Sequence, residues 1–114
     1  MHEWSLALEI IKITEKEIGA RKAKSALEVE VTVGKLNNIV KEQLIDAFEV
    51  AKKETLLSKS LLKIVEVEAR GYCKSCEKEF IIDNPFIFCP KCGSMDINIL
   101  SGEELSCNKI VLEF

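Results

Sequence analysis

Four cysteines arranged as two CxxC pairs constrain the fold of this chain more than any other feature. Cys73 and Cys76 form the first pair, twelve residues follow, and Cys89 and Cys92 form the second pair. A CxxC turn directs two thiolates at one ion, and two such turns complete the tetrahedral coordination that zinc adopts in proteins. Because protein sulfur would fill all four positions, we predict a structural zinc site rather than a catalytic one.

The segment around these cysteines has the character of a small module that depends on its metal. Pro90 fixes φ and Gly93 permits a positive φ, so both residues suit a tight metal-binding turn. We predict that residues 71–107 form a zinc-binding domain with too little apolar core to fold without the ion. A rubredoxin-type iron site uses similar turns and is the alternative for the metal. The fifth cysteine, Cys107, is interpreted as a small buried residue, with a redox-active thiol as the alternative.

The rest of the chain carries the periodic patterns of two helices and three strands. Helices are predicted for residues 4–18 and 39–54, and strands for residues 26–33, 61–69 and 109–114. In the first strand apolar residues alternate with Glu28, Glu30 and Thr32, which is typical of a sheet with one solvated face.

Turn-forming residues set the expected ends of these elements. Gly19 is predicted to end the first helix, and Asn37 or Asn38 to cap the second. Ser101 and Gly102 are predicted to form a hairpin turn between the segments MDINIL and EELSC.

These elements together predict an α+β fold. Two helices pack on one face of a small three-stranded sheet, and a zinc-ribbon-like module with four cysteine ligands is inserted before the last strand. We expect residues 1–70 and 108–114 to form one α+β domain and residues 71–107 to form the zinc-binding domain.

Met1, His2 and Glu3 form a second set of metal donors. His2 is the only histidine in the chain. The Met1 amine, the His2 amide nitrogen and the His2 imidazole can close adjacent chelate rings on one ion, with the Glu3 carboxylate or amide as a fourth donor. Such a nitrogen set favours Ni(II) or Cu(II), with zinc as a further alternative. The positive end of the following helix weakens cation binding, so we expect a site that binds and releases its metal and is sensitive to acid.

Composition and charge exclude several other classes of protein. The formal net charge is −3 and the lysines are scattered among glutamates, which disfavours general binding to nucleic acid. No apolar run approaches the roughly 18 residues that span a bilayer, and no basic segment precedes Glu3 to form a secretory signal. We therefore expect a cytoplasmic protein with reduced cysteines and no membrane partner. No nucleophile–base pair or phosphate-binding glycine loop is present, so we do not expect an enzyme.

Four stretches of the chain share the motifs of one known family. They are the opening MHEWSLA, the segments LEVEVTVGKL and DAFEVAKKET, and the module CKSC…CPKCGS followed by a returning strand. In this order, and over nearly the whole chain, they resemble the HypA/HybF family of hydrogenase nickel-incorporation proteins, which are nickel metallochaperones. A zinc-ribbon module that binds nucleic acid or protein without nickel transfer is the alternative interpretation.

The resemblance implies two metal sites with different roles. It implies a transferable Ni(II) cargo bound through His2, with Met1 and Glu3 contributing. It implies a structural zinc ion at the four cysteines, handover to a nickel-handling GTPase, and delivery into the large subunit of [NiFe] hydrogenase. In some family members an Asp just ahead of the second helix approaches the nickel, whereas the matching position here is Val40, so that water or another carboxylate would replace it. We expect a monomer or a weak homodimer.

Overall fold

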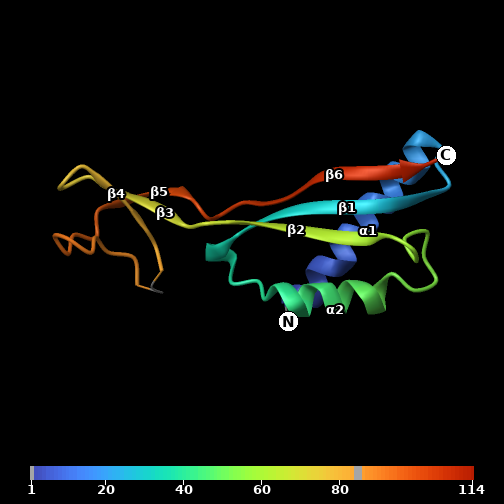
Figure 1. The fold of residues 1–114 in the computed structure, drawn as a ribbon, viewed down its shortest axis with the longest axis horizontal. Helices are drawn as coiled ribbons and strands as arrows, with labels where there is room; N and C mark the ends of the chain where they lie inside the picture. Colours follow the sequence, from blue (N-terminus) through green and yellow to red (C-terminus); the bar gives the residue numbers. More distant parts are fainter. Residues whose placement is uncertain (1, 84–85) are drawn as a thin grey trace. The chain divides into compact units, whose positions relative to one another are not determined.

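The computed structural model describes residues 2–83 and 86–114, so that Met1, Asn84 and Pro85 lie outside the described residues. Its elements are α1 (His2–Arg21), β1 (Ser25–Gly34), the short 3-10 helix η1 (Lys35–Asn37), α2 (Lys41–Ala51), β2 (Leu61–Val67), β3 (Arg70–Cys73), β4 (Lys78–Ile81), β5 (Ile97–Ser101) and β6 (Leu105–Glu113) (Figure 1). They form two three-stranded sheets, with strand orders β2-β1-β6 and β4-β3-β5. The predicted α+β class, with two helices, a small three-stranded sheet and a four-cysteine module, is confirmed, while the second sheet was not predicted.

The chain divides into two compact units. The first, which we call the helical unit, comprises Met1–Thr32, Ile39–Val65 and Ser106–Phe114. The second, which we call the cysteine unit, comprises Val33–Asn38 and Glu66–Leu105. Each unit is therefore assembled from segments that lie apart in the sequence.

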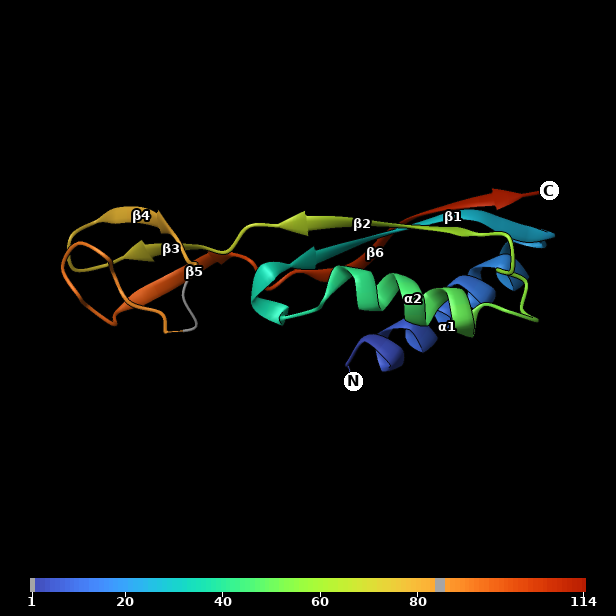
Figure 2. The same cartoon turned by 60° about the horizontal axis from the view of Figure 1, so that its bottom comes forward.

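Apolar burial organises the helical unit. The buried face of α1 includes Ala7, Ile11 and Ile18, which recur at the three- and four-residue spacing of one helix face. Leu44 and Phe48 of α2 are fully buried, and α1 and α2 pack against each other. Both helices lie on the same side of the sheet (Figure 2), so its other face is left to solvent.

The solvent face of the helical unit's sheet is polar, as its alternating pattern predicts. Glu30 of β1 forms an ion pair with Lys63 of β2 at 3.6 Å and accepts a hydrogen bond from Asn108 of β6 at 2.6 Å. Thr32 donates a hydrogen bond to the same asparagine at 2.8 Å. These contacts link all three strands across the sheet without adding to the apolar core.

The predicted end of the first helix is wrong. The helix continues through Gly19 and ends at Arg21. The next residue, Lys22, has a φ of 56°. The Ala23 N–H then donates to the Ile18 carbonyl at 3.0 Å, a bond that closes the last turn. A glycine inside a helix costs only about 1 kcal/mol, and the fully buried Ile18 side chain favours continuation of the helix past it.

The predicted cap of the second helix is also wrong. Val40, rather than Asn37 or Asn38, is the N-cap residue of α2, and its side chain makes no capping hydrogen bond. The Asn37 amide instead donates to the carbonyls of Gly34 and Glu104, at 3.2 and 2.7 Å. The Asn37 side chain thus connects two backbone segments of the cysteine unit instead of capping a helix.

The predicted hairpin at Ser101 and Gly102 does not form. β5 pairs with β3 in one sheet, whereas β6 belongs to the other sheet beside β1. Gly102 has a φ of 111° and lies against Ala69, where an added Cβ would come within 2.6 Å of the Ala69 Cα. The glycine therefore permits a close crossing of two backbones rather than a turn between paired strands.

Candidate metal centres

The four cysteines of the CxxC pairs converge on one point in the cysteine unit. Their Sγ atoms all lie within 4.8 Å of one another. The Cys73 and Cys92 sulfurs are 3.5 Å apart, and those of Cys76 and Cys89 are 3.6 Å apart. Four thiolates at the usual zinc–sulfur distance of about 2.3 Å are separated by about 3.8 Å in a tetrahedron. The chemistry and spacing of this donor set therefore fit a zinc ion with no open coordination position.

The two CxxC turns have the same backbone design. In the first, the Glu77 N–H donates to the Cys73 carbonyl at 2.8 Å, and in the second the Gly93 N–H donates to the Cys89 carbonyl at 2.8 Å. Both donors have a positive φ, of 56° at Glu77 and 74° at Gly93. The positive φ expected at Gly93 is confirmed, while the matching role of Glu77 was missed because glutamate rarely adopts this conformation.

The backbone also divides the four thiols into two kinds. The backbone N–H of Cys92 lowers the pKa of Cys89 to about 6, and the backbone N–H of Cys76 lowers the pKa of Cys73. Hydrogen bonding to the Cys73 sulfur raises the pKa of Cys76 to about 12. The first cysteine of each turn thus has its pKa lowered and the second has its pKa raised, and any protons on the four sulfurs leave as an ion binds.

The N-terminal donors begin the first helix of the helical unit. His2 is the first residue of α1 and its side chain is exposed, whereas Met1 lies outside the described residues. Glu3 is only 7% exposed, and its Oε2 accepts a hydrogen bond from the Val40 N–H at 2.9 Å. This bond lowers the pKa of the Glu3 carboxyl to about 2, so the group is ionised throughout the physiological range.

The contact between Glu3 and Val40 joins the starts of two helices. Glu3 lies in the first turn of α1, and Val40 is the N-cap residue of α2. A carboxylate is favoured at both places because the free N–H groups of a helix start carry partial positive charge. The sequence pattern did not reveal this contact, since its partners are separated by 37 residues. Val40 is thereby held against an acidic side chain from α1.

The fifth cysteine is not a member of this cluster. Cys107 is in β6 of the helical unit, where it is partly buried, and burial raises the pKa of its thiol. A raised pKa disfavours the reactive thiolate form. The structure therefore supports the interpretation of Cys107 as a small packing residue.

Comparison with known proteins identifies the family. The sequence model described as "HypA: Hydrogenase/urease nickel incorporation, metallochaperone, hypA" matches residues 1–112. The chain is 36% identical over 113 residues to the hydrogenase maturation factor HypA of Geobacter metallireducens, covering 99% of this chain and 100% of that protein. The corresponding factor of Chlorobium luteolum is 35% identical over 113 residues, covering 99% and 97% of the two chains. The chain belongs to the HypA family.

Solved structures of the family have the same fold. The solution structure of the Ni metallochaperone HypA from Helicobacter pylori matches with a TM-score of 0.67 and 25% identity, covering 97% of both chains. A second HypA solution structure matches with a TM-score of 0.69 and 26% identity, covering 98% of this chain and 96% of the other. As a member of the HypA family, this chain is a nickel-incorporation metallochaperone of hydrogenase maturation and not an enzyme.

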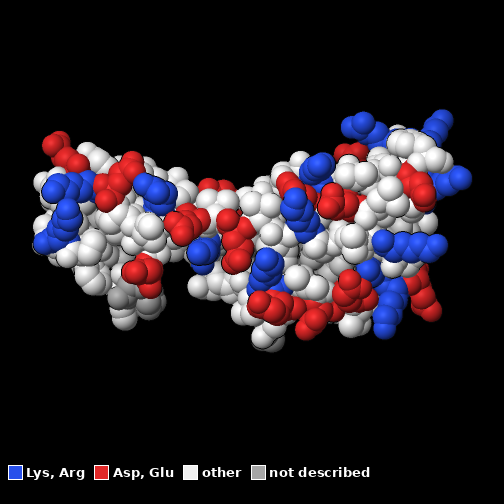
Figure 3. Space-filling model, in the orientation of Figure 1, with Lys and Arg blue, Asp and Glu red and all other residues white. Residues whose placement is uncertain are grey.

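Positive and negative side chains are mixed on the surface. On the side seen in Figure 3, Lys and Arg side chains lie among Asp and Glu in both parts of the molecule. Neither helix in the part of the chain that the structure describes is both long and apolar enough to cross a lipid bilayer.

Proposed function

We propose that the chain carries one Ni(II) ion on Met1, His2 and Glu3 and releases it during hydrogenase maturation. The observation that carries this proposal is the exposed imidazole of His2 at the start of a helix that Glu3 anchors to α2. The imidazole can meet an incoming ion and a receiving protein without any rearrangement of the core. Amine, amide and imidazole nitrogens suit Ni(II), which prefers a planar nitrogen set.

The structure favours a particular role for Glu3 in this site. Its Oε2 is engaged with the Val40 N–H at 2.9 Å, so ligation by that oxygen would cost the hydrogen bond. We therefore assign the nickel contact of Glu3 to its backbone amide, and assign its carboxylate to holding the first turn of α1 in place. The negative charge of the carboxylate also offsets the positive helix end that would otherwise repel the ion.

The two metals then serve different parts of the chain. Residues 1–70 and 108–114 act as the nickel-handling domain, and residues 71–107 act as the zinc-binding domain. Four thiolates occupy every position around a tetrahedral zinc ion, so the ion stabilises its module and is not transferred. At the N-terminus fewer protein donors compete for the ion, and an incoming ligand can displace them.

We infer the receiving partners from family membership. A nickel-handling GTPase takes the ion from the chain, and the large subunit of [NiFe] hydrogenase is its destination. The family description also names urease, so urease maturation is the alternative destination. Transfer from the nickel-loaded chain to each purified partner, followed by metal analysis, distinguishes these routes.

The decisive test is a nickel titration of the zinc-loaded, untagged chain followed by calorimetry. We expect about one Ni(II) per chain in addition to zinc, with binding lost at low pH because amine and imidazole must both be deprotonated. His2→Ala and a short extension ahead of Met1 should both abolish this binding. Glu9→Ala, which removes an exposed acidic group from the same helix, is the matched control and should bind like the parent. Equal nickel binding by His2→Ala would show that the site lies elsewhere.

A further inference from the structure

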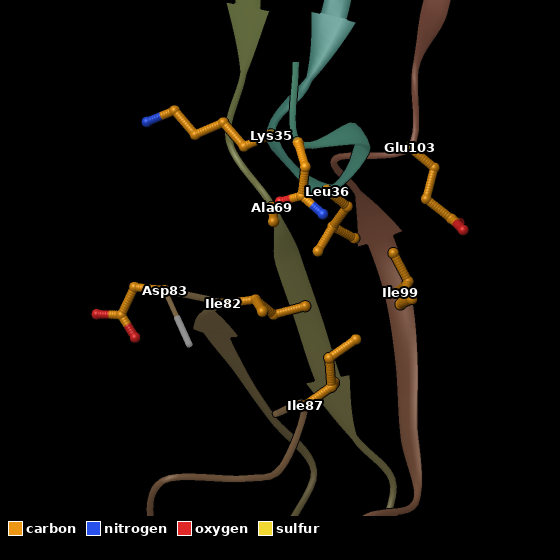
Figure 4. Close-up of a pocket in the computed structure, with 9 residues that line it drawn as sticks. Lys35, Leu36, Ala69, Ile82, Asp83, Ile87, Ile99 and Glu103 are labelled. Atoms are coloured by element: carbon orange, nitrogen blue, oxygen red, sulfur yellow. The ribbon is translucent and has the colours of Figure 1, made fainter. Parts of the chain in front are cut away.

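The cysteine unit contains a cavity, lined in part by aliphatic side chains, that the metal chemistry does not use. Its volume is about 560 Å³, and its apolar lining is formed by Leu36, Ala69, Ile82, Ile87 and Ile99. In Figure 4 the side chains of Leu36, Ile82, Ile87 and Ile99 point toward one another into this space. The lining comes from η1, the start of β3, the segments that follow β4, and β5, so several separate stretches converge on one hollow.

The cavity is open to solvent rather than part of the core. Ala69 is buried, but Ile99 is 37% exposed and the other aliphatic side chains of the lining are only partly covered. Water in contact with such a surface gains no hydrogen bonds from it, so displacing that water with an apolar group is favourable. The volume falls within the range of about 300–1,000 Å³ that is typical of ligand pockets.

Backbone contacts hold the wall of the cavity in shape. The Leu36 N–H donates to the Gly102 carbonyl at 2.9 Å, and the Ile82 N–H donates to the Ala69 carbonyl at 2.8 Å. A Cβ at Gly34 would lie 2.1 Å from the Gly102 carbonyl oxygen, so only glycine permits this approach. These contacts fix the part of the wall formed by Leu36, Ala69 and Ile82, which lowers the cost of ordering the cavity around a ligand.

Charged residues occur only around the rim. Asp83 and Glu103 point away from the hollow on its two sides (Figure 4), and neither has an ion-pair partner among the described residues. The one cation of the rim, Lys35, lies 4.0 Å from the carboxylate of Glu68, which offsets its charge. The rim as a whole is thus acidic, and a basic group is its electrostatic complement.

We infer that this cavity is a docking site for a partner protein, which inserts one aliphatic or aromatic side chain between Leu36, Ile82 and Ile99 and places a neighbouring Lys or Arg at the rim, beside Asp83 or Glu103. Aliphatic side chains form the larger part of the lining, beside Asn38, and so favour an apolar group over a small polar metabolite. An apolar anchor seated in a preformed pocket with charges at the rim is the usual arrangement of a protein-binding hot spot.

Peptide selection provides the test. Random linear peptides displayed on phage are selected on the zinc-loaded full chain, and enriched sequences are synthesised and titrated by fluorescence anisotropy. We expect sequences in which a large apolar residue stands next to Lys or Arg. Ile99→Glu should weaken their binding by about tenfold or more, because it places a charge in the apolar hollow. Leu100→Glu is the matched control, since the next residue of the same strand faces the other way.

Two further variants test the cavity independently of Ile99→Glu. Leu36→Glu approaches the cavity from a different segment and replaces Ile99→Glu if that variant fails to retain zinc. The double variant Asp83→Asn, Glu103→Gln should weaken peptide binding several-fold at low salt and remove most of its salt dependence. The inference is overturned if no peptide is enriched, if enriched peptides are acidic, or if they bind Ile99→Glu as tightly as the parent. Self-association that Ile99→Glu abolishes would instead identify a second copy of the chain as the occupant.

Discussion

The two units of this protein reach a folded state by different means. In the described residues, the helical unit buries Ala7, Ile10, Ile11, Ile18, Ala26, Val29, Val31, Leu44, Phe48 and Leu57. Among its described residues, the cysteine unit buries the side chains of only Val33, Ala69, Cys73 and Cys89, of which two are candidate metal donors. Apolar burial of this extent can stabilise the first unit, whereas the second has too few buried side chains to offset the entropy of ordering its chain.

This difference matches the roles we propose for the two metals. A unit that depends on its ion for folding must retain it, whereas a unit with its own core can lose an ion and remain folded. Nickel transfer from the helical unit would therefore leave the carrier intact for another cycle. The following predictions test this division, beginning with the largest expected effect.

Removal of zinc should unfold the cysteine unit alone. Structural zinc in small finger peptides contributes roughly 10–16 kcal/mol at neutral pH, far more than four buried side chains can supply. After treatment with a chelator and a reductant, amide hydrogen exchange should show loss of protection in β3, β4 and β5 and its retention in α1 and α2. Cys107→Ser should keep its zinc. Loss of protection in both units in one step would contradict the division.

Truncation of a core side chain in the helical unit should destabilise that unit and leave zinc binding by the cysteine unit unchanged. Phe48→Ala removes a fully buried ring from α2 and should lower the free energy of unfolding of the helical unit by about 3–5 kcal/mol. Zinc content should remain one ion per chain, as measured by atomic emission. Val50→Ala, at a 57% exposed position on the same helix, is the control and should change stability by less than about 0.5 kcal/mol. Zinc loss by Phe48→Ala would show that the units are coupled.

The two cysteine turns offer a finer comparison inside one unit. Gly93→Ala should weaken zinc affinity roughly five-fold, since a Cβ at positive φ costs about 1 kcal/mol, and no atom within 4 Å would be crowded by it. Glu77→Gly should strengthen affinity by a smaller factor, because glycine relieves the strain but also adds freedom to the unfolded chain. Competition with a chromophoric chelator measures both. If both substitutions change zinc affinity equally and in the same direction, the two turns do not share one backbone design.

The smallest expected effect is a pH dependence of the helical unit. The Val40 N–H lowers the pKa of Glu3 from 4.5 to about 2, so its stabilising contribution is complete above pH 4.5 and is lost as the pH falls toward 2. Protection of α1 and α2 amides in the parent should therefore decline over this interval more steeply than in Glu3→Gln. Glu9→Gln, an exposed change in the same helix, should follow the parent. If amide protection in the parent and in Glu3→Gln depends on pH in the same way, the Glu3 carboxylate does not stabilise the helical unit.

Local features of the sequence predicted the site better than distant ones. The CxxC spacing identified all four sulfurs because each turn is a local structure, and alternation identified β1 because Val29 and Val31 are buried on one face. β3 and β4 were not foreseen, since RGYC and KEFI are too short for a clear pattern and pair only within the folded cysteine unit. The Glu3–Val40 contact likewise depends on how α1 and α2 pack, which no spacing encodes.

The place of β6 in the chain has a consequence for biosynthesis. β1 is the central strand of its sheet, with β2 and β6 as neighbours, and β6 begins at Leu105, after all four zinc ligands. During translation, β1 therefore waits with one edge unpaired until every thiol of the cysteine unit has been synthesised. Since nascent chains fold as their segments emerge, the zinc module can close on the ribosome before the nickel carrier is complete. A chain released before Leu105 would expose the β1 edge to aggregation.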